Sequence, residues 1–285
     1  MKKLSIVIPI YNVERYLPAC FDSCLDPTRA EDYEIVAVND GSTNGAIDVL
    51  REYEAEHPGV FRIIDRENRG AGLSRNEGFL AATGDYVWFV DADDALDSDY
   101  LGTMLDVAAQ TDADVVASDS TFVEAGRLRR FGMIEPDRLF ETRDELWEAF
   151  LAERMPWSLW AKLYRAELFE GLRFDSRDFI AEDLDANARI FAREHLRVAT
   201  TGCTGYRYRI ETGSIDHSFD ERHLCQFDVF ERVVQLVHRE GIHTTTSPER
   251  FYEERMLNCL RKAIEADALT PGIRRAFKKA IARHR

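Results

Sequence analysis

Three aspartates that follow a short apolar segment are the residues of this chain best suited to chemistry. Residues 86–90 are large and apolar, which is typical of a buried strand, and Asp91, Asp93 and Asp94 follow directly. In an open α/β sheet, ligands bind beyond the carboxyl ends of the strands. If the chain stays extended here, Asp91 and Asp93 project to the same side, because side chains alternate along a strand. Two such carboxylates repel one another unless a cation lies beside them.

This acidic cluster predicts a site for a hard divalent cation, Mg²⁺ or Mn²⁺, held by Asp93 and Asp91 and able to bridge phosphate oxygens. The alternative is that Asp91 caps a helix and that Asp93 and Asp94 are solvated loop charges. Because an Asp-x-Asp sequence is common, the motif alone does not distinguish the two interpretations, and the surrounding sequence is needed.

Candidate strands and helices alternate through the first part of the chain. The first strand is interrupted by Pro9 and is expected to end in a loop there. The second runs into Asp40-Gly41-Ser42-Thr43, which combines a turn with a helix N-cap. The expected strands are the apolar run at residues 4–12, broken by Pro9, and residues 34–39 and 61–65, and the expected helices are residues 45–56 and 70–82. This alternation predicts an α/β fold with a mostly parallel sheet covered on both faces.

Several motifs, in their order and spacing, resemble those of the family 2 glycosyltransferases with the GT-A fold. The resemblance covers roughly the first 215 residues. The motifs are Ser5-Ile6-Val7-Ile8-Pro9-Ile10-Tyr11-Asn12, Asn39-Asp40-Gly41-Ser42-Thr43, Asn68-Arg69-Gly70-Ala71-Gly72-Leu73-Ser74-Arg75-Asn76, Asp91-Ala92-Asp93-Asp94, Trp160-Ala161-Lys162-Leu163-Tyr164 and Glu182-Asp183-Leu184.

The resemblance implies a GT-A-type α/β fold, in which helices flank a mostly parallel nucleotide-binding sheet and a C-terminal helical extension follows. Residues 1–217 would form the glycosyltransferase domain, with a nucleotide-sugar-binding half at 1–119 and an acceptor half at 120–217. Residues 218–285 would form the C-terminal helical region, with helical patterns at 220–240, 248–268 and 271–285.

The same resemblance implies a binding site for the nucleotide of a sugar donor. Asp40 would bind the base, because a carboxylate accepts a hydrogen bond from the ring imide of uracil or thymine. Tyr11 and the backbone around Pro9 would flank the base, and Asp91 and Ala92 would also contact the donor. The alternative for Asp40 is a simple Asp-Gly turn.

The segment at residues 70–75 nearly spells a dinucleotide-binding fingerprint, but Arg75 occupies the place of its third glycine. We therefore interpret Gly70 and Gly72 as positions of close backbone approach. Arg69 and Arg75 are candidates for contacting the nucleotide or its phosphates. An ion pair between Arg75 and a neighbouring carboxylate is an equally good interpretation.

The acceptor half contains the expected catalytic carboxylates. In the resembled family an acidic residue of the Glu-Asp motif is the general base, and we assign this role to Asp183, with Glu182 as the second choice. Acidic residues at a helix start are otherwise ordinary, because they complement the helix dipole. Arg209, followed by a loop at residues 212–215, would neutralise the departing phosphates.

Aromatic and apolar residues in the acceptor half have two interpretations. Trp157 and Trp160 can stack on a sugar, although buried core tryptophans are commoner. Strands are expected at residues 115–119 and, as a strand or hairpin arm, at 127–134. Residues 143–153 predict an amphipathic helix whose apolar side holds Leu146, Trp147, Phe150 and Leu151.

Composition limits the partners. A net charge of −15 argues against nucleic acid as a partner. The five cysteines lack a metal-ligand spacing, and the sequence shows no secretory signal and no apolar span. We therefore expect reduced thiols in the cytoplasm. Cys20 and Cys24 are expected in a core. Residues 271–285 carry six basic side chains and no acidic one, so the remainder carries −21.

The basic C-terminal helix has two interpretations. It has an apolar face made of Ile273, Phe277, Ala280 and Ile281. Such a helix can bind an anionic membrane at the inner face as a peripheral contact, or it can dock on the protein itself.

The resemblance implies inverting transfer of one sugar from a nucleotide diphosphate sugar, with UDP as the expected nucleotide, to a glycan or lipid-linked acceptor. The Gln-x-x-Arg-Trp motif of processive relatives is missing, so one sugar per encounter is expected. Two alternatives remain at this point, a sugar nucleotidyltransferase and a non-catalytic protein that binds sugar nucleotides or glycans.

Overall fold

The protein folds around one ten-stranded sheet, described by a computed structural model that covers residues 3–26, 28–175, 180–210 and 219–282. The strands are β1 (Leu4–Ile10), β2 (Tyr33–Asp40), β3 (Phe61–Arg66), β4 (Tyr86–Phe89), β5 (Ala95–Leu96), β6 (Val115–Glu124), β7 (Arg127–Arg130), β8 (Leu139–Phe140), β9 (Lys162–Arg165) and β10 (Val198–Ile210). The order across the sheet is β3-β2-β1-β4-β9-β6-β10-β5, with β7 beside β6 and β8 beside β10.

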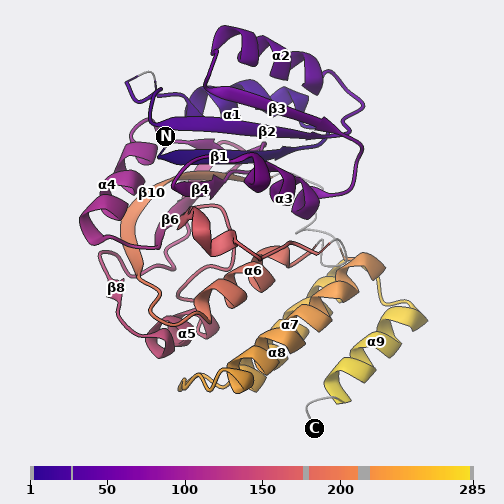
Figure 1. Cartoon of the computed structure of the whole chain (residues 1–285). Helices are drawn as coiled ribbons and strands as arrows, with labels where there is room; N and C mark the ends of the chain where they lie inside the picture. The colour runs from indigo at the N-terminus through magenta and orange to yellow at the C-terminus, as the bar shows by residue number, and fades with distance from the viewer. Residues whose placement is uncertain (1–2, 27, 176–179, 211–218, 283–285) are drawn as a thin grey trace.

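Helices cover the sheet and continue beyond it (Figure 1). The α-helices are α1 (Leu17–Cys24), α2 (Ala46–Glu56), α3 (Ala71–Ala81), α4 (Tyr100–Thr111), α5 (Arg143–Leu151), α6 (Glu182–Phe191), α7 (Cys225–Arg239), α8 (Pro248–Glu265) and α9 (Pro271–Ile281). The short 3₁₀ helices are η1 (Glu14–Tyr16), η2 (Ala166–Phe169) and η4 (Glu221–Leu224). The predicted α/β class, with a helical C-terminal extension, is confirmed.

The first four strands in this order are parallel, as the strand–helix alternation predicts. β1 pairs in parallel with β2 and β4, and β2 pairs in parallel with β3. Alternate residues of β1 enter separate hydrophobic clusters, with Val7 on one face and Ile6 and Ile8 on the other. A strand buried on both faces has to be apolar throughout, which explains the near-continuous apolar segment.

The expected interruption of the first strand at Pro9 is wrong. β1 runs on to Ile10, and Pro9 pairs with Val38 of β2. On its other side, β1 pairs with β4 only from Leu4 to Val7. Pro9 lies beyond that ladder, so a proline, which has no N–H group, is accommodated within a central strand.

The acceptor half adds antiparallel pairs. β9 lies antiparallel between β4 and β6, and β10 then pairs in parallel with β6. The expected strand at residues 115–119 is longer than predicted, because β6 continues to Glu124 and forms the outer hairpin with β7. The ladder between β10 and β6 shifts register between Thr201 and Tyr206, which redirects the strand toward β5.

Most predicted helices are confirmed, but the N-cap expected for α2 is not. α2 begins after Gly45, which makes no side-chain cap, so the Asp40-to-Thr43 segment is not its N-cap. The Gly45 N–H group instead donates to Glu14 Oε2 over 3.0 Å. The loops after β1 and β2 are therefore joined at this edge of the sheet.

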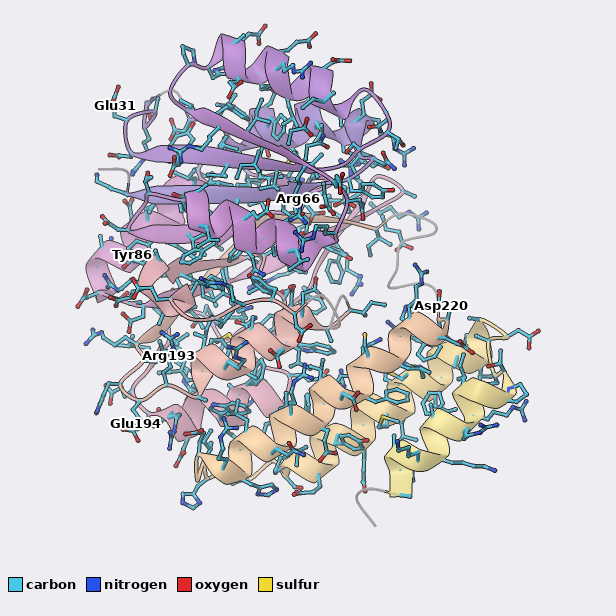
Figure 2. The ribbon with its side chains drawn as sticks, turned by 45° about the vertical axis from the view of Figure 1, so that its right-hand side comes forward. Glu31, Arg66, Tyr86, Arg193, Glu194 and Asp220 are labelled. Carbon is cyan, nitrogen blue, oxygen red and sulfur yellow. The ribbon has the colours of Figure 1, made fainter. Side chains whose placement is uncertain are left out.

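The interior is apolar where the sequence predicts it. Cys20 and Cys24 are buried free thiols in one cluster, and Trp147 and Phe150 of α5 are buried in the other. Figure 2 shows Glu31 and Glu194 at the surface, as expected for charged side chains.

The last helix packs on the protein. Ile273, Phe277 and Ala280 of α9 are buried, and the Tyr252 hydroxyl of α8 donates to the Ala280 carbonyl over 3.2 Å. Of the apolar face predicted for membrane contact, Ile281 alone is exposed among those four residues, at 41%. That face is therefore used for docking, because it buries apolar area against α7, α8 and η4. In the part of the chain that is described, no helix combines the length and apolar character needed to cross a membrane.

Candidate active site

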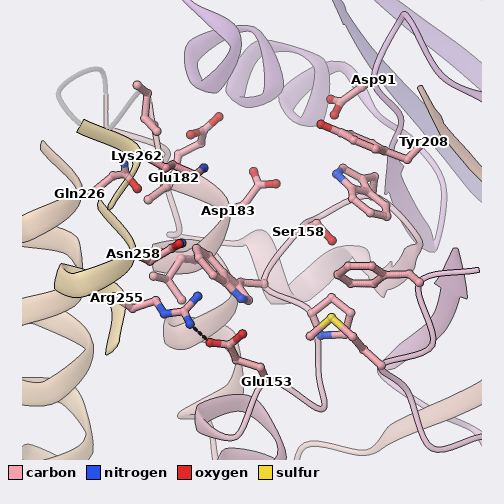
Figure 3. Close-up of a pocket in the computed structure, with 18 of the residues that line it drawn as sticks. Asp91, Glu153, Ser158, Glu182, Asp183, Tyr208, Gln226, Arg255, Asn258 and Lys262 are labelled. Carbon is pink, nitrogen blue, oxygen red and sulfur yellow. Dashed lines mark ion pairs between the residues drawn. The ribbon is translucent and has the colours of Figure 1, made fainter. Parts of the chain in front are cut away.

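A cavity of about 860 Å³ lies between the ends of the central strands and the C-terminal helices. Five of its lining residues are acidic, namely Asp91, Asp93, Glu153, Glu182 and Asp183. Figure 3 shows Glu182 and Asp183 between Asp91 on one side and the polar side chains of α8 on the other. The structure thus brings the predicted metal cluster and the predicted general base to one space.

The aspartate cluster forms a turn and does not stay extended. The Asp94 N–H group donates to the Asp91 carbonyl over 3.0 Å. Asp94 is buried and accepts from the Tyr206 hydroxyl at 2.7 Å and from the Arg209 N–H group at 2.8 Å. These bonds pull Asp94 inward, so the prediction of an extended segment is wrong, although Asp91 and Asp93 still line the same cavity.

The fixed position of Asp94 also shapes the electrostatics of the turn. Burial raises the pKa of Asp94 well above its usual value, and the charges of Asp91 and Asp93 add to this shift. The Tyr206 hydroxyl accepts a hydrogen bond from the Asp91 N–H group at 3.2 Å while it donates to Asp94. Asp91 is not a helix cap, and its carboxylate is available to the cavity.

Arg75 connects the two acidic groups. Its Nη1 lies 2.7 Å from Glu182 Oε1 and 3.6 Å from Asp183 Oδ1, and its Nη2 lies 3.0 Å from Asp91 Oδ1. The side chain is 6% exposed. Burial acts to lower the pKa of Arg75, but the attraction of Asp183, Asp91 and Glu182 raises it above its usual value. The ion-pair interpretation of Arg75 is confirmed, and its contact with a nucleotide stays a prediction.

Glu182 and Asp183 begin α6 and have raised pKa values. Burial raises the pKa of Glu182 to about 7, with the Asp183 charge adding to the shift and Arg75 opposing it. Burial also raises the pKa of Asp183, against the Arg75 charge. Asp183 Oδ2 accepts from the Leu159 N–H group at 3.0 Å, whereas Oδ1 accepts no hydrogen bond from the described residues. Oδ1 is closed to solvent and lies 3.6 Å from Arg75 Nη1.

A buried polar network holds the segment that orients Asp183. The Asn187 amide donates to the carbonyls of Trp157 and Asp183 at 2.7 and 3.1 Å, and it accepts from the Tyr164 hydroxyl at 2.8 Å. Lys162 Nζ donates to the Ser158 carbonyl at 2.6 Å. The segment thus fixed at residues 157–159 presents the Leu159 N–H group to Asp183.

Lys162 belongs to this network as a fully buried cation. Burial lowers the pKa of Lys162 to about 7, and the Asp183 charge opposes the shift. The motif at residues 160–164 therefore contributes Lys162 to the buried network that positions the Asp183 carboxylate.

Asp40 anchors the loop that precedes α3. Its Oδ1 accepts from the Arg69 N–H group at 3.0 Å, its Oδ2 accepts from Gly70 at 2.7 Å, and Arg66 Nε lies 3.3 Å from Oδ1. Figure 2 shows Arg66 beside this end of the sheet. Oδ1 therefore already has two nitrogen neighbours, and Asp40 is 2% exposed, so the expected hydrogen bond to a base stays a prediction. The cavity is lined by Tyr11, which is 49% exposed, while Pro9 and Arg69 lie outside its lining.

The two glycines of the loop have different roles from the one predicted. Gly70 has a φ of +95°, and a Cβ atom added there would have no neighbour within 4 Å. Glycine is therefore required by the backbone conformation and not by close approach. At Gly72 a Cβ atom would lie 3.1 Å from Phe174 Cβ, so that position is one of close contact with a side chain.

Arg209 lies behind the aspartate turn. Its Nε donates to the Asp93 carbonyl at 2.9 Å, and its guanidinium lies 5.0 Å from the centre of the Tyr16 ring. Ala92 is buried at 4% exposure, and it lies outside the cavity lining, as does Arg209. The adjoining loop predicted at residues 212–215 lies outside the described residues.

Trp157 and Trp160, the two candidates for stacking on a sugar, both line the cavity. Trp160 stacks on Tyr206 and Tyr208 with ring centres 4.9 and 5.0 Å apart, so it combines a packing role with a place in the cavity wall. The C-terminal helices contribute Gln226, Arg255, Asn258 and Lys262. These four residues were not predicted. The sequence does hold a signal for three of them, because Arg255, Asn258 and Lys262 share one face of α8 at a spacing of three and four residues.

The carboxylates fit a divalent cation bound together with a diphosphate. Among the described residues, no three or more His, Cys, Asp or Glu side chains gather into a metal-binding group. Mg²⁺ is usually held by one or two carboxylates together with substrate phosphates, and it does not need a complete protein cage. Asp93 and Asp91, which line the same cavity, supply that number of carboxylates.

Curated relatives of the chain are glycosyltransferases. Glycosyltransferase GlyA of Streptococcus pneumoniae is 32% identical over 251 residues, which is 82% of this chain and 34% of the relative. The uncharacterized glycosyltransferase EpsJ of Bacillus subtilis is 34% identical over 220 residues, which is 74% of this chain and 62% of the relative. The chain thus spans about a third to two thirds of the length of these relatives.

Solved structures share the fold. S. aureus TarS 1-349 in complex with UDP-GlcNAc superposes with a TM-score of 0.71 and 19% identity, covering 99% of this chain and 80% of that chain. The mannosyltransferase PcManGT from Pyrobaculum calidifontis, in complex with GDP-Man and Mn²⁺, has a TM-score of 0.57 and 17% identity, covering 98% and 74%. At these identities the likeness shows the fold alone, and it confirms the expected GT-A architecture.

The family match covers most of the domain that holds the aspartate turn, Arg75 and the Glu-Asp pair. The Glycosyl transferase family 2 pattern matches residues 5–197. The chain therefore belongs to glycosyl transferase family 2.

Proposed function

We propose that this chain is a metal-dependent, inverting glycosyltransferase that adds a single sugar to a hydroxyl of a glycan or lipid-linked acceptor. The observation that carries the proposal is that Asp91 and Asp93 share one cavity with Glu182 and Asp183. A transferase of this kind needs one carboxylate set for the diphosphate and another for the attacking hydroxyl, and both are present.

The proposed donor is a UDP-linked sugar. Asp40, Tyr11 and the backbone near Pro9 would receive the base, and Arg69 would lie beside the nucleotide. The complexes of TarS with UDP and UDP-GlcNAc support this choice, because they place such a ligand on the same fold. Asp40 holds the loop at Arg69 and Gly70 in position before any ligand arrives.

Asp93 and Asp91 would hold Mg²⁺ or Mn²⁺. When bound, the cation supplies Lewis acidity to the diphosphate and makes it a better leaving group. Arg75 fixes Asp91 from the opposite side through the 3.0 Å contact. Arg209, held by the Asp93 carbonyl, is placed to balance negative charge near the turn.

Asp183 would act as the general base. The acceptor oxygen attacks the anomeric carbon, the bond from that carbon to the diphosphate oxygen breaks, and the hydroxyl proton passes to the Asp183 carboxylate. One displacement without a covalent intermediate inverts the anomeric configuration. The Leu159 N–H group holds this carboxylate in position through Oδ2.

The test is a screen of UDP-, GDP- and dTDP-sugars with Mg²⁺ or Mn²⁺, reading nucleoside diphosphate release and thermal stabilisation, since a bound donor raises apparent stability. We expect one UDP-sugar to be hydrolysed slowly without acceptor. Pyrophosphate release from a nucleoside triphosphate would instead show a nucleotidyltransferase, and binding without turnover of any donor would show a binding protein.

We also propose a cytoplasmic reaction with peripheral membrane contact through α9. All five cysteines are free, which suits a reducing compartment. Arg274, Arg275, Lys278 and Lys279 are exposed on the outer side of α9. Because the apolar face is docked, such contact would be electrostatic, by about 1 kcal/mol per basic residue.

A further inference from the structure

The cavity extends beyond Asp183 to a wall formed by α7 and α8. Gln226 of α7 and Arg255, Asn258 and Lys262 of α8 line this end. Figure 3 shows these four side chains on the side of Glu182 and Asp183 that lies away from Asp91. An acceptor whose hydroxyl reaches Asp183 would contact this wall, because the donor would lie on the other side, at Asp91 and Asp93.

Arg255 is a mostly buried cation in this wall of the cavity. It forms an ion pair with Glu153, and its guanidinium lies 5.2 Å from the centre of the Trp157 ring. Its side chain is 12% exposed, and its Nε has no hydrogen-bond partner among the residues described. A buried donor without an acceptor is costly, so an acceptor atom from a ligand would be stabilising here.

Lys262 adds a second cation, and its charge is not balanced locally. It is half-buried, it lines the cavity, and no residue in the described ranges forms an ion pair or hydrogen bond with it. Lys262 lies seven residues after Arg255, so both project from one face of α8. The other charged residues of the lining are Arg75 and five acidic residues, Asp91, Asp93, Glu153, Glu182 and Asp183.

From these contacts we infer that the acceptor carries an anionic group, a phosphate or a carboxylate, near its reacting hydroxyl, and that Lys262 and Arg255 bind this group. The inference rests on the proposed function, because it concerns the acceptor of that same reaction. Ammonium and guanidinium groups form charge-assisted hydrogen bonds with such anions. In a chain of net charge −15 they give an anionic acceptor a favourable local partner.

A different assignment of these cations, to the donor diphosphate, fits the geometry less well. The donor phosphates would lie at Asp91 and Asp93, where Arg75 and Arg209 are the neighbouring cations. Lys262 and Arg255 come from α8, on the other side of the Glu182–Asp183 pair (Figure 3). An anion bound there has to belong to a second ligand.

The first experiment measures binding. Wild-type protein saturated with UDP and Mg²⁺ is titrated with sn-glycerol 3-phosphate, inorganic phosphate and glycerol by calorimetry. We expect both phosphates to bind and glycerol not to bind. Lys262→Gln should weaken phosphate binding about tenfold, the scale of a charge-assisted hydrogen bond. The matched control is Lys279→Gln, which removes the same charge from exposed α9 and should bind as the wild type does.

The second experiment measures transfer to acceptor pairs that differ by one charge. The pairs are glycerol with sn-glycerol 3-phosphate, N-acetylglucosamine with its 1-phosphate, and glucose with glucuronic acid. We expect a charged member to be preferred. For that acceptor, Lys262→Gln should raise KM about tenfold and leave kcat within about twofold, and Lys262→Arg should restore KM.

The outcomes distinguish a phosphate from a carboxylate on the acceptor, and failure of this inference from failure of the proposed function. Preference in the phosphate pairs identifies a phosphate-bearing acceptor, and preference in the glucuronic acid pair identifies a carboxylate. Equal use of neutral and charged members, or unchanged binding in Lys262→Gln, overturns the inference while donor hydrolysis still supports the proposed function. If no nucleotide sugar is hydrolysed or bound, the proposed function itself has failed.

Discussion

Arg75 of α3 donates a hydrogen bond of 2.7 Å to Glu182 at the start of α6, a residue 107 positions further along the chain. The same guanidinium contacts Asp91 at 3.0 Å. One buried cation therefore fixes the distance between the predicted metal ligand and the predicted base. Carboxylates this close would otherwise repel one another, so the arrangement of the site depends on Arg75.

Replacing Arg75 should destabilise the protein most at high pH. Arg75→Met leaves Glu182, Asp183 and Asp91 without their common cation, and removing one partner of a buried pair costs about 3–5 kcal/mol. The folded-state pKa values of Glu182 and Asp183 are already raised and should rise further. The folded state then binds more protons than the unfolded state, so stability falls as pH rises through about 7.

Urea unfolding at pH 5 and pH 8 checks this prediction, with a loss that is larger at pH 8. The control is Arg250→Met, which breaks an exposed pair with Glu254. Such pairs contribute about 0–1 kcal/mol, so little change is expected at either pH. An equal loss for Arg75→Met at both pH values would contradict the electrostatic account.

The metal prediction is tested at Asp93. Asp93→Ala should abolish Mn²⁺- or Mg²⁺-dependent donor turnover without unfolding the chain, because Asp93 lies in a turn at the cavity and not in the apolar core. Asp91→Ala should also impair turnover, and it additionally removes a partner of Arg75. Full wild-type activity after exhaustive chelation would rule out the proposed metal.

The general-base prediction is tested at Asp183. Asp183→Asn keeps the size of the side chain but cannot take a proton, so transfer should fall by roughly two or more orders of magnitude. Donor binding, measured by calorimetry, should survive. Normal transfer by Asp183→Asn together with loss in Glu182→Gln would assign the base to Glu182.

The pH dependence of transfer gives a separate check on this pair. Because a base acts only when deprotonated, and burial raises the pKa of Asp183, the rate should rise with pH over a range above that of an ordinary aspartate. Glu182→Gln removes a negative charge beside Asp183 and should move this rise to lower pH, since like charge favours the protonated form. A pH profile that stays unshifted in Glu182→Gln would show that the two carboxylates do not interact.

The polar network under Asp183 should matter for rate as well as stability. Asn187→Ala leaves the Trp157 carbonyl and the Tyr164 hydroxyl without a partner, which costs about 1–3 kcal/mol per buried group. We expect kcat to fall while donor KM stays near the wild-type value, because Leu159 no longer holds Asp183 Oδ2 in place. Tyr164→Phe, which loses one hydrogen bond, should show a smaller change. Loss of stability without any change in kcat would make the network purely structural.

The membrane prediction now concerns charge alone. Intact protein should sediment with anionic liposomes at low salt and be released at high salt, since screening weakens exposed charges. Replacing Arg274, Arg275, Lys278 and Lys279 by glutamine should abolish binding and leave donor hydrolysis unchanged. Neutral liposomes are the control, and no binding of the intact chain to anionic liposomes at low salt would refute the contact.

The sequence by itself determined the elements of the nucleotide half and the motifs that end its strands. Apolar periodicity and turn residues act locally, so β2, α2, β3 and α3 lie close to their predicted ranges. The order of the motifs, through the family resemblance, also predicted that Asp91, Asp93 and Asp183 share one site, and all three line one cavity.

Tertiary structure decided which partner each polar side chain takes. The turn at Asp91 arises because Tyr206, 112 positions from Asp94, draws that carboxylate inward. Arg75 could not be assigned from sequence, since its partners at Asp91 and Glu182 come from separate elements. The acceptor wall and the docked face of α9 likewise depend on how helices pack. Periodicity shows that a helix has an apolar face, but only long-range packing selects the surface that covers it.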